Sequence, residues 1–172
     1  PAPLAFYDNY TRSLRRFEPL EPAGPVGVYT CGPTVYDFQH IGNFRTFLFE
    51  DVLKRVLRWN GYDVNHVMNV TDVGHLVSDA DEGEDKIEKT ARLEHLEPME
   101  VVQNYMNTFH RNMDQLNTLK PSIEPRASGH IIEQQEFIKL LLDKGYAYAV
   151  NGSVYFDVLK YSQSFKYGKL SG

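Results

Sequence analysis

The chain has 172 residues, of which 42% are hydrophobic and 24% charged, and its 18 Lys+Arg against 23 Asp+Glu give a net charge of −5. This length suffices for a buried core without disulfides, and the single cysteine, Cys31, excludes a disulfide framework and a zinc cluster made of cysteines alone. No apolar run approaches the ~18 residues of a membrane helix. Basic residues do not outnumber acidic ones, so the composition does not indicate a large nucleic-acid surface. We expect both ends to be ends of a fragment, because the chain starts with Pro1 instead of Met and no helix or strand is completed at Gly172.

The first half of the chain has the pattern of a strand, a helix and a second strand. Val26–Thr30 is predicted to be a strand, and a helix follows over 43–59 with Asn43 as its N-cap and Asn60-Gly61 as its stop. Residues 62–70 form the second predicted strand. Such a βαβ unit implies an α/β fold with a parallel sheet.

The second half is predicted to contain two helices and a hairpin. The helices are expected over 98–116 and 129–144, and Asn151-Gly152 suits a type I′ turn between strands at 146–150 and 153–158. Because a hairpin after two helices does not continue a βαβ pattern, we expect a boundary near residue 121. Residues 1–120 are then one domain and residues 121–172 a separate helix-and-hairpin segment.

The negative charge is concentrated between Asp79 and Glu100, where nine acidic residues stand against three basic ones. This segment is predicted to be a solvated, partly mobile face. The string D-A-D-E-G-E-D that it contains lacks the full twelve-residue pattern of a calcium loop.

The loop from Cys31 to Thr46 carries the predicted chemistry. It joins the end of a strand to the start of a helix, where ligands of open parallel sheets gather and where backbone N–H groups bind anions. His40 and Asn43 flank this helix start, and Gly42 lets a ligand approach the backbone. The loop therefore predicts a site for a nucleotide phosphate.

The same loop resembles a known family. His40-Ile41-Gly42-Asn43 resembles the HIGH motif of class I aminoacyl-tRNA synthetases, and C-G-P-T-V-Y-D from Cys31 resembles the cysteinyl-tRNA synthetases in particular. The resemblance continues over nearly the whole chain, in the strings N-V-T-D-V from Asn69, E-P-R-A, G-Y-A-Y and V-Y-F-D.

The resemblance implies a fold and an activity. The fold is the N-terminal part of a doubly wound, Rossmann-like (HUP-type) parallel-sheet domain, followed after residue 121 by the start of a connective insertion with helices and a β-hairpin. The activity is activation of L-cysteine with ATP and Mg²⁺ to cysteinyl-adenylate, then transfer to tRNA(Cys). We expect a cytoplasmic monomer with no membrane contact. We also expect the chain to be inactive alone, because no K-M-S-K-S loop is present.

The resemblance also assigns roles to individual residues. His40 and Asn43 match the catalytic motif residues that hold the ATP phosphates, together with Gly42. Gly32, Thr34 and Thr71 match positions that line the amino-acid pocket. Cys31 matches one zinc ligand, the others lying in later parts of the family's chain, so the zinc site is incomplete here. Asn43 stands where the motif has His, and an amide still donates hydrogen bonds.

Other readings stay open on the sequence alone. One is a ligase of the same superfamily that joins cysteine to an amino sugar, and another is a nucleotide-binding module without catalysis. Outside its motif, Cys31 would be a small buried hydrophobe, and the two threonines would satisfy backbone groups at strand ends. His66 is predicted to be a core or edge residue of its strand, and Trp59 to pack between helix and strand.

Overall fold

The computed structural model describes residues 3–74 and 85–170, which form two compact units. The first unit consists of the described residues from Pro19 to Gly129. The second joins the described residues up to Glu18 with those from His130 onward. The division after Gly129 concerns packing, so the boundary predicted near residue 121, which concerns an inserted segment, stays a prediction.

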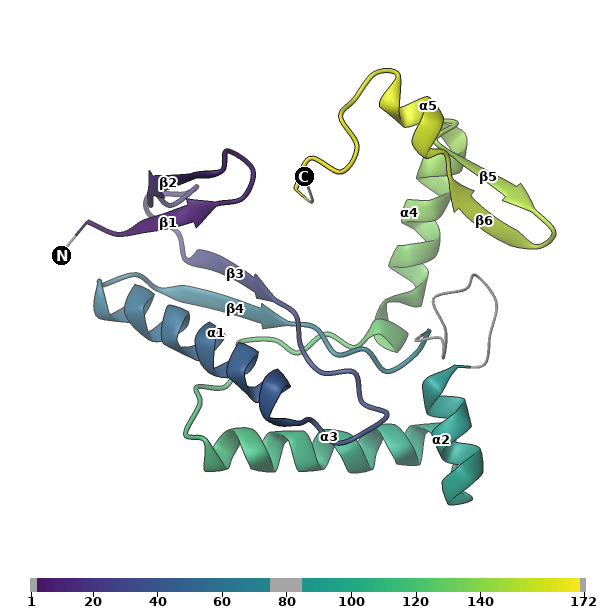
Figure 1. The fold of residues 1–172 in the computed structure, drawn as a ribbon, viewed down its shortest axis with the longest axis horizontal. Coiled ribbons are helices and arrows are strands. Elements are labelled where there is room, and N and C mark those ends of the chain that lie inside the picture. Colours follow the sequence, from purple (N-terminus) through teal and green to yellow (C-terminus); the bar gives the residue numbers. More distant parts are fainter. Residues whose placement is uncertain (1–2, 75–84, 171–172) are drawn as a thin grey trace. The chain divides into compact units, whose positions relative to one another are not determined.

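The predicted βαβ arrangement is confirmed in the first unit (Figure 1). Strand β3 (Val26–Thr30) leads through the loop into helix α1 (Ile41–Trp59), and strand β4 (Val64–Met68) returns parallel to β3 with Val26 opposite Val64. Strand β4 is shorter than the predicted 62–70, and alternate side chains along it are buried, so one face of the pair is covered. The stop at Asn60-Gly61 is confirmed, since Gly61 has a φ of +86°.

A third parallel segment, which the sequence analysis did not predict, lies on the free edge of β4. Bridges pair Val67 with Ile123 and Val70 with Arg126, and the Val70 N–H donates to the Pro125 carbonyl over 2.8 Å. Strand β4 is therefore the middle of three parallel segments, which bears out the predicted α/β class.

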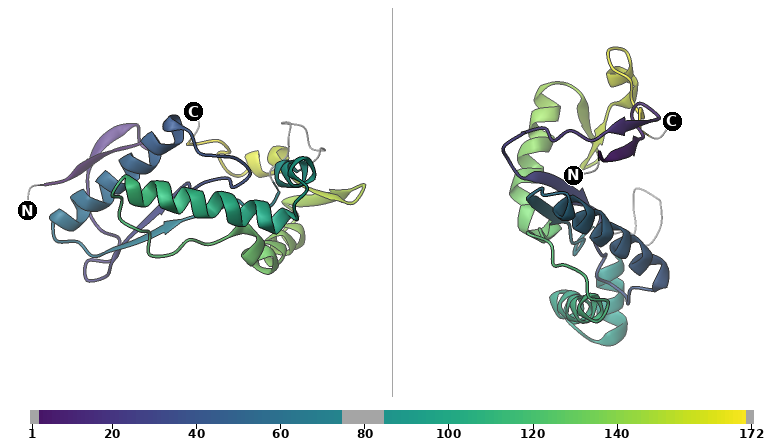
Figure 2. Two further views of the ribbon diagram at one scale, coloured as in Figure 1. Left: turned by 90° about the horizontal axis from the view of Figure 1, so that it is seen from below. Right: turned by 90° about the vertical axis from the view of Figure 1, so that its left-hand side faces the viewer.

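Helices α1 and α3 (Pro98–Gln115) lie on the same face of the β3–β4 pair (Figures 1 and 2). The Phe47 ring of α1 meets the Phe109 ring of α3 edge to face, with 5.2 Å between centroids, and both rings are buried. Helix α3 is confirmed where a helix was predicted, and its buried side follows helical spacing and consists of Val101, Val102, Met106, Phe109 and Met113.

Helix α2 (Lys86–Glu94) corrects part of the prediction for the acidic segment. The Asp85 carboxylate caps it by accepting from the N–H groups of Ile87 (2.8 Å) and Glu88. Ile87 and Ala91 are 2% and 3% exposed and belong to the core, so one side of this stretch is docked, while the charged side chains of Glu88, Lys89 and Arg92 are exposed as predicted. The remainder of the acidic prediction, from Asp79 to Glu84, lies outside the described residues.

The second unit contains short elements. Strands β1 (Ala5–Asp8) and β2 (Ser13–Arg16) form an antiparallel hairpin that was not predicted. The helix predicted over 129–144 is α4 (Ile131–Asp143), preceded by a 3₁₀ turn, η1 (Ala127–His130). The hairpin of β5 (Ala147–Val150) and β6 (Ser153–Phe156) is confirmed, and α5 (Val158–Ser162) follows it.

The hairpin turn has the predicted geometry, because Asn151 and Gly152 have φ values of 51° and +83°. The packing role predicted for Trp59 is wrong, since this side chain is 91% exposed. No helix among residues 3–74 and 85–170 is long and apolar enough to cross a membrane.

Candidate functional site

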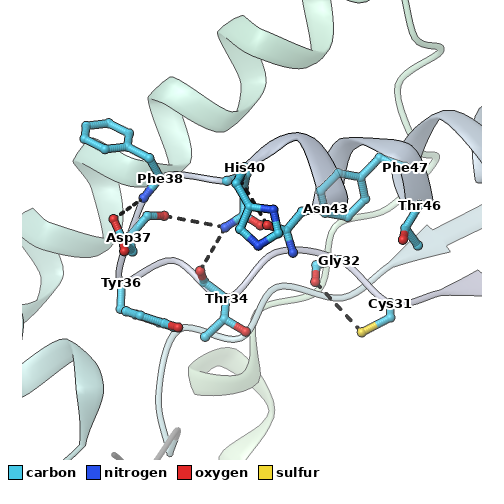
Figure 3. A pocket seen from close by; sticks show the side chains of 11 residues that line it. Cys31, Gly32, Thr34, Tyr36, Asp37, Phe38, His40, Asn43, Thr46 and Phe47 are labelled. Atoms are coloured by element: carbon cyan, nitrogen blue, oxygen red, sulfur yellow. Dashed lines mark hydrogen bonds between the residues drawn. The ribbon is translucent and has the colours of Figure 1, made fainter.

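A cavity of about 380 Å³ opens where β3 ends and α1 begins (Figure 3). Its walls are the loop from Cys31 to His40 and the first turns of α1, at Asn43, Thr46 and Phe47. Five of the seven predicted site residues line it: Cys31, Gly32, Thr34, His40 and Asn43.

Backbone pairing beyond the strand ends positions the Thr34 side of this cavity. Thr34 and Thr71 form a parallel bridge, with the Val35 N–H donating to the Thr71 carbonyl over 3.1 Å and the Thr71 N–H donating to the Pro33 carbonyl over 3.0 Å. Thr71 does not line the cavity but lies next to Thr34, which does. The structure thus brings together two predicted site residues that are 37 positions apart in the sequence.

Gly32 occupies a position that admits no side chain. A Cβ atom there would lie 1.9 Å from the Asn69 carbonyl oxygen and 2.7 Å from Met68 Cγ. The Gly32 N–H also donates to Asn69 Oδ1 over 3.1 Å. Glycine is therefore required for the backbone after β3 to approach the backbone after β4, which is a physical reason that the sequence analysis did not give.

Helix α1 begins two residues earlier than predicted, and its N-cap is His40 rather than Asn43. His40 Nδ1 accepts from the Gly42 N–H over 3.0 Å, and Asn43 Oδ1 accepts from the His40 N–H over 3.1 Å. This reciprocal capping box orients both side chains. It follows that a neutral His40 carries its proton on Nε2, and that the Asn43 amine keeps its two donors for other partners.

The same capping changes the predicted mode of anion binding. The backbone N–H of Gly42 donates to the His40 ring, and those of Asn43 and Phe44 donate to the His40 carbonyl over 2.9 and 3.2 Å. Three backbone donors of the first turn are therefore already used. The side chains of His40 and Asn43 offer further donors at this end of the cavity.

Gln39 also shapes the loop, although the sequence analysis assigned it no role. Its Nε2 donates to the carbonyls of Thr34 over 3.2 Å and Asp37 over 3.5 Å. Since a side-chain amide has no sequence signature for such bracing, only the folded loop reveals it.

Cys31 is exposed, and its Sγ lies 3.9 Å from the Gly32 carbonyl oxygen. Over the described parts of the chain, no group of three or more His, Cys, Asp or Glu side chains could hold a metal ion. Because a tetrahedral zinc site takes four ligands, these residues do not form one by themselves. Cys31 fits such a site only as a single ligand.

A buried polar cluster lies between β3, β4 and α1, beneath the loop. Thr30 Oγ1 is 2.9 Å from His66 Nε2 and hydrogen-bonds the Glu50 carboxyl group. Burial raises the pKa of Glu50 above its usual 4.5 and lowers the pKa of His66 below its usual 6.5. His66 is 2% exposed, which confirms its predicted place in the core.

Comparison with known proteins shows the family to which the chain belongs. The sequence matches the family of class I (C) tRNA synthetase catalytic domains over residues 16–172, so the chain belongs to that family. The resemblance drawn from the sequence motifs is thereby confirmed at the level of the family.

The curated proteins that are similar to this chain carry a more specific name than the family. The chain is 59% identical to a cysteine–tRNA ligase of Bacteroides fragilis and 53% identical to one of Deinococcus radiodurans, in each case over 98% of the chain. It covers 34% and 33% of these two relatives, and therefore spans about a third of their length.

A solved structure shares the fold. The LeuRS of Agrobacterium radiobacter K84 in a ternary complex with tRNA and LeuAMS matches with a TM-score of 0.59 and 26% identity, over 76% of this chain and 16% of that one. The predicted Rossmann-like class of the catalytic domain is consistent with this match.

Proposed function

We propose that the chain carries part of the active site of a cysteine–tRNA ligase, where cysteine reacts with ATP to form cysteinyl-adenylate before transfer to tRNA(Cys). The observation that carries the proposal is the cavity that holds Cys31 and Thr34 beside the donor pair of His40 and Asn43. The names of the similar proteins supply the substrate. The proposal places the enzyme in the cytoplasm, where tRNA is charged.

The phosphate side of the proposed reaction needs donors and no general base. The carboxylate of cysteine is ionised at neutral pH and attacks the α-phosphate of ATP directly, the bond to the β-phosphate breaks and pyrophosphate leaves. Catalysis therefore consists of positioning and of stabilising charge on the phosphoryl oxygens. The capping box supports this role, because it leaves His40 Nε2–H and the Asn43 amine as oriented donors at the cavity. In this proposal, Gly42 acts through His40, against whose ring a Cβ at Gly42 would lie at 2.8 Å.

The amino-acid side is proposed to be formed by Gly32, Thr34 and Thr71, with Cys31 as one zinc ligand and the remaining ligands from residues beyond those described. Bound zinc would supply selectivity for the substrate thiolate over a hydroxyl group, since thiolate is the softer ligand. The described residues supply the polar lining and the single thiol. Mg²⁺ is proposed to enter with ATP, as its phosphate partner.

The amino-sugar ligase reading has less support, because the similar proteins described above are named cysteine–tRNA ligases. A purely nucleotide-binding module would not account for a thiol and a threonine pair beside the donors. We therefore retain one function.

The test is a calorimetric titration of this chain with a non-hydrolysable cysteinyl-adenylate analogue, with the seryl analogue as a control. His40→Asn is the sharpest variant, because Asn is an excellent N-cap and so preserves the start of α1 while removing the imidazole donor. We expect this variant to bind the analogue about tenfold more weakly or worse, as befits a hydrogen bond to a charged group.

Two results would contradict the proposal. One is an unchanged affinity in His40→Asn, with α1 intact by circular dichroism. The other is an affinity for the adenylate analogue no greater than that for adenosine alone, which would place no phosphate at His40.

A further inference from the structure

The sequence contains two Asn-Gly steps, Asn60-Gly61 and Asn151-Gly152. An asparagine that precedes glycine is prone to lose its side-chain amide, because glycine lacks the Cβ that shields the following backbone nitrogen in other residues. The first step follows α1, and the second is the turn between β5 and β6. The same dipeptide therefore occurs in two different environments of one chain.

Hydrogen bonds hold both reacting groups of the first step. The Asn60 side chain donates from Nδ2 to the Val56 carbonyl over 2.8 Å. The Gly61 N–H donates to the Arg58 carbonyl over 2.9 Å. A reaction between this side-chain amide and this backbone nitrogen therefore requires the C-terminal end of α1 to open first.

The second step lacks both of these restraints. The register of the hairpin pairs Val150 with Ser153, so the two turn residues lie outside the ladder, at the end of the hairpin remote from α4 (Figure 1). Asn151 and Gly152 are exposed, and a Cβ built at Gly152 would have no atom within 4 Å. Within the described residues, no hydrogen bond engages the Asn151 side chain or the Gly152 N–H. The two groups are free to meet without unfolding of an element.

We propose that Asn151 is a site of spontaneous deamidation and that Asn60 is protected from the same reaction. The Gly152 nitrogen loses its proton and bonds to Cγ of Asn151, the Cγ–Nδ2 bond breaks, and ammonia leaves. Water then hydrolyses the resulting cyclic imide. Cleavage of the new N–Cγ bond leaves aspartate in an ordinary backbone, whereas cleavage of the bond between the nitrogen and the main-chain carbonyl carbon leaves isoaspartate. Water is the co-reactant, and no oxidant or reductant takes part.

Isoaspartate at this position opens the hairpin. Its backbone runs through Cβ, so the turn gains a chain atom and loses the type I′ geometry that φ values of 51° at Asn151 and +83° at Gly152 define. The second unit buries none of its described residues, so no core holds β5 against β6 once the turn has changed. The proposed modification therefore acts on the β5–β6 hairpin as a whole.

The experiment incubates this chain at mildly alkaline pH and follows the acidic products at both asparagines by peptide mass spectrometry. Trypsin releases Gly145–Lys160, in which Asn151 is the single asparagine. We expect Asn151 to convert at least about tenfold faster than Asn60, because two hydrogen bonds must open at Asn60. In urea, which unfolds the chain and exposes both steps, the two rates should become similar.

Asn151→Asp is the matched control for the effect on the hairpin, because it adds the same negative charge and keeps the ordinary backbone. Amide hydrogen exchange at β5 and β6 should rise in the chromatographic fraction of the aged chain that carries isoaspartate. Exchange in freshly purified Asn151→Asp should stay close to that of the original chain. The added backbone atom, and not the charge, is then the cause of the opening.

Three results would overturn the proposal. The first is an aged chain with no acid at Asn151, and the second is conversion of Asn60 as fast as Asn151 in the folded chain. The third is a difference between the two rates that persists in urea, since the folded environment would then not be its cause. An isoaspartate fraction whose exchange matches that of Asn151→Asp would overturn the opening of the hairpin.

Discussion

The two compact units are stabilised by different means. All residues that are buried among those described lie in the unit of Pro19–Gly129, where three helices and the sheet share one core. The other unit buries none of its described residues, and ring contacts such as Tyr161–Phe165 at 4.9 Å and Tyr148–Tyr155 at 5.8 Å connect its short elements. Only the first unit has a hydrophobic core that can fix the geometry of a site.

The net charge also differs between the two units. Six of the 23 acidic residues but eight of the 18 basic ones belong to the second unit, so the first carries the whole net negative charge. The candidate site lies on the unit that carries the excess of acidic residues.

The largest test of this comparison removes one phenylalanine from each unit. Phe109 is 2% exposed and packs in the core, whereas Phe137 is 62% exposed. We expect Phe109→Ala to destabilise the first unit by about 3–5 kcal/mol and Phe137→Ala to change stability by about 0.5 kcal/mol or less. Amide hydrogen exchange resolved by segment measures both, and similar effects would refute the contrast in packing.

A smaller effect is expected where the backbone itself is packed. Gly32→Ala places a Cβ against the Asn69 carbonyl, while a Cβ added at Gly27 in strand β3 would have no atom within 4 Å. Overpacking at Gly32 should destabilise the first unit by about 1–3 kcal/mol, and Gly27→Ala should be neutral or slightly stabilising. Urea denaturation of the two variants is the measurement, and tolerance of Ala at Gly32 would contradict the close approach.

The sequence predicted the elements whose signals are local. The βαβ unit, helix α3 and the Asn151-Gly152 hairpin were all predicted, because periodicity and turn chemistry act within a few residues. The loop that holds Cys31, His40 and Asn43 was also found, through its motif, and the structure places these residues around one cavity.

The missed features depend on contacts between distant residues. Helix α2 was missed because the acidic excess of the longer segment 79–100 outweighed two buried side chains, Ile87 and Ala91, which only the core selects. The third parallel segment contains Pro125 and pairs by isolated bridges, so it has no strand pattern. The His40 N-cap was missed because His is not a typical capping residue.

Helix capping offers a third, weaker comparison. Asp85 caps α2 in the first unit and Asp157 caps α5 in the second by accepting from the Lys160 N–H over 2.8 Å. Either change to Ala removes a cap worth about 1 kcal/mol. We expect Asp85→Ala to raise exchange in α2 and at its buried neighbours, and Asp157→Ala to act on α5 alone, because α5 buries no residue. If Asp157→Ala raised exchange beyond α5, the second unit would have a shared core, which its described residues do not form.

The smallest effects concern pH, and they have opposite signs in the two units. Arg15 holds the pKa of Asp8 in the second unit at about 2, below its usual 3.8, by a hydrogen bond, whereas burial raises the pKa of Glu50 in the first. A depressed carboxyl pKa contributes stability that is present above pH 3.8 and is lost as the pH falls toward 2. A raised carboxyl pKa contributes stability that is present below pH 4.5 and is lost as the pH rises through the folded value.

His66 must be separated from Glu50, since its lowered pKa contributes stability that is present above pH 6.5 and is lost as the pH falls below it. Glu50→Gln makes this separation, because the His66 contribution is common to the variant and the original chain. Relative to the variant, the first unit of the original chain should lose stability as the pH rises from 4.5 toward 7. Asp8→Asn, followed in the β1–β2 hairpin, should differ from the original chain above pH 3.8 and converge with it toward pH 2. Denaturation at a series of pH values gives the pH dependence of the stability difference for Glu50→Gln, and amide exchange at β1 gives it for Asp8→Asn. If both differences changed with pH in the same direction, Glu50 would not be buried in the way that the core of the first unit requires.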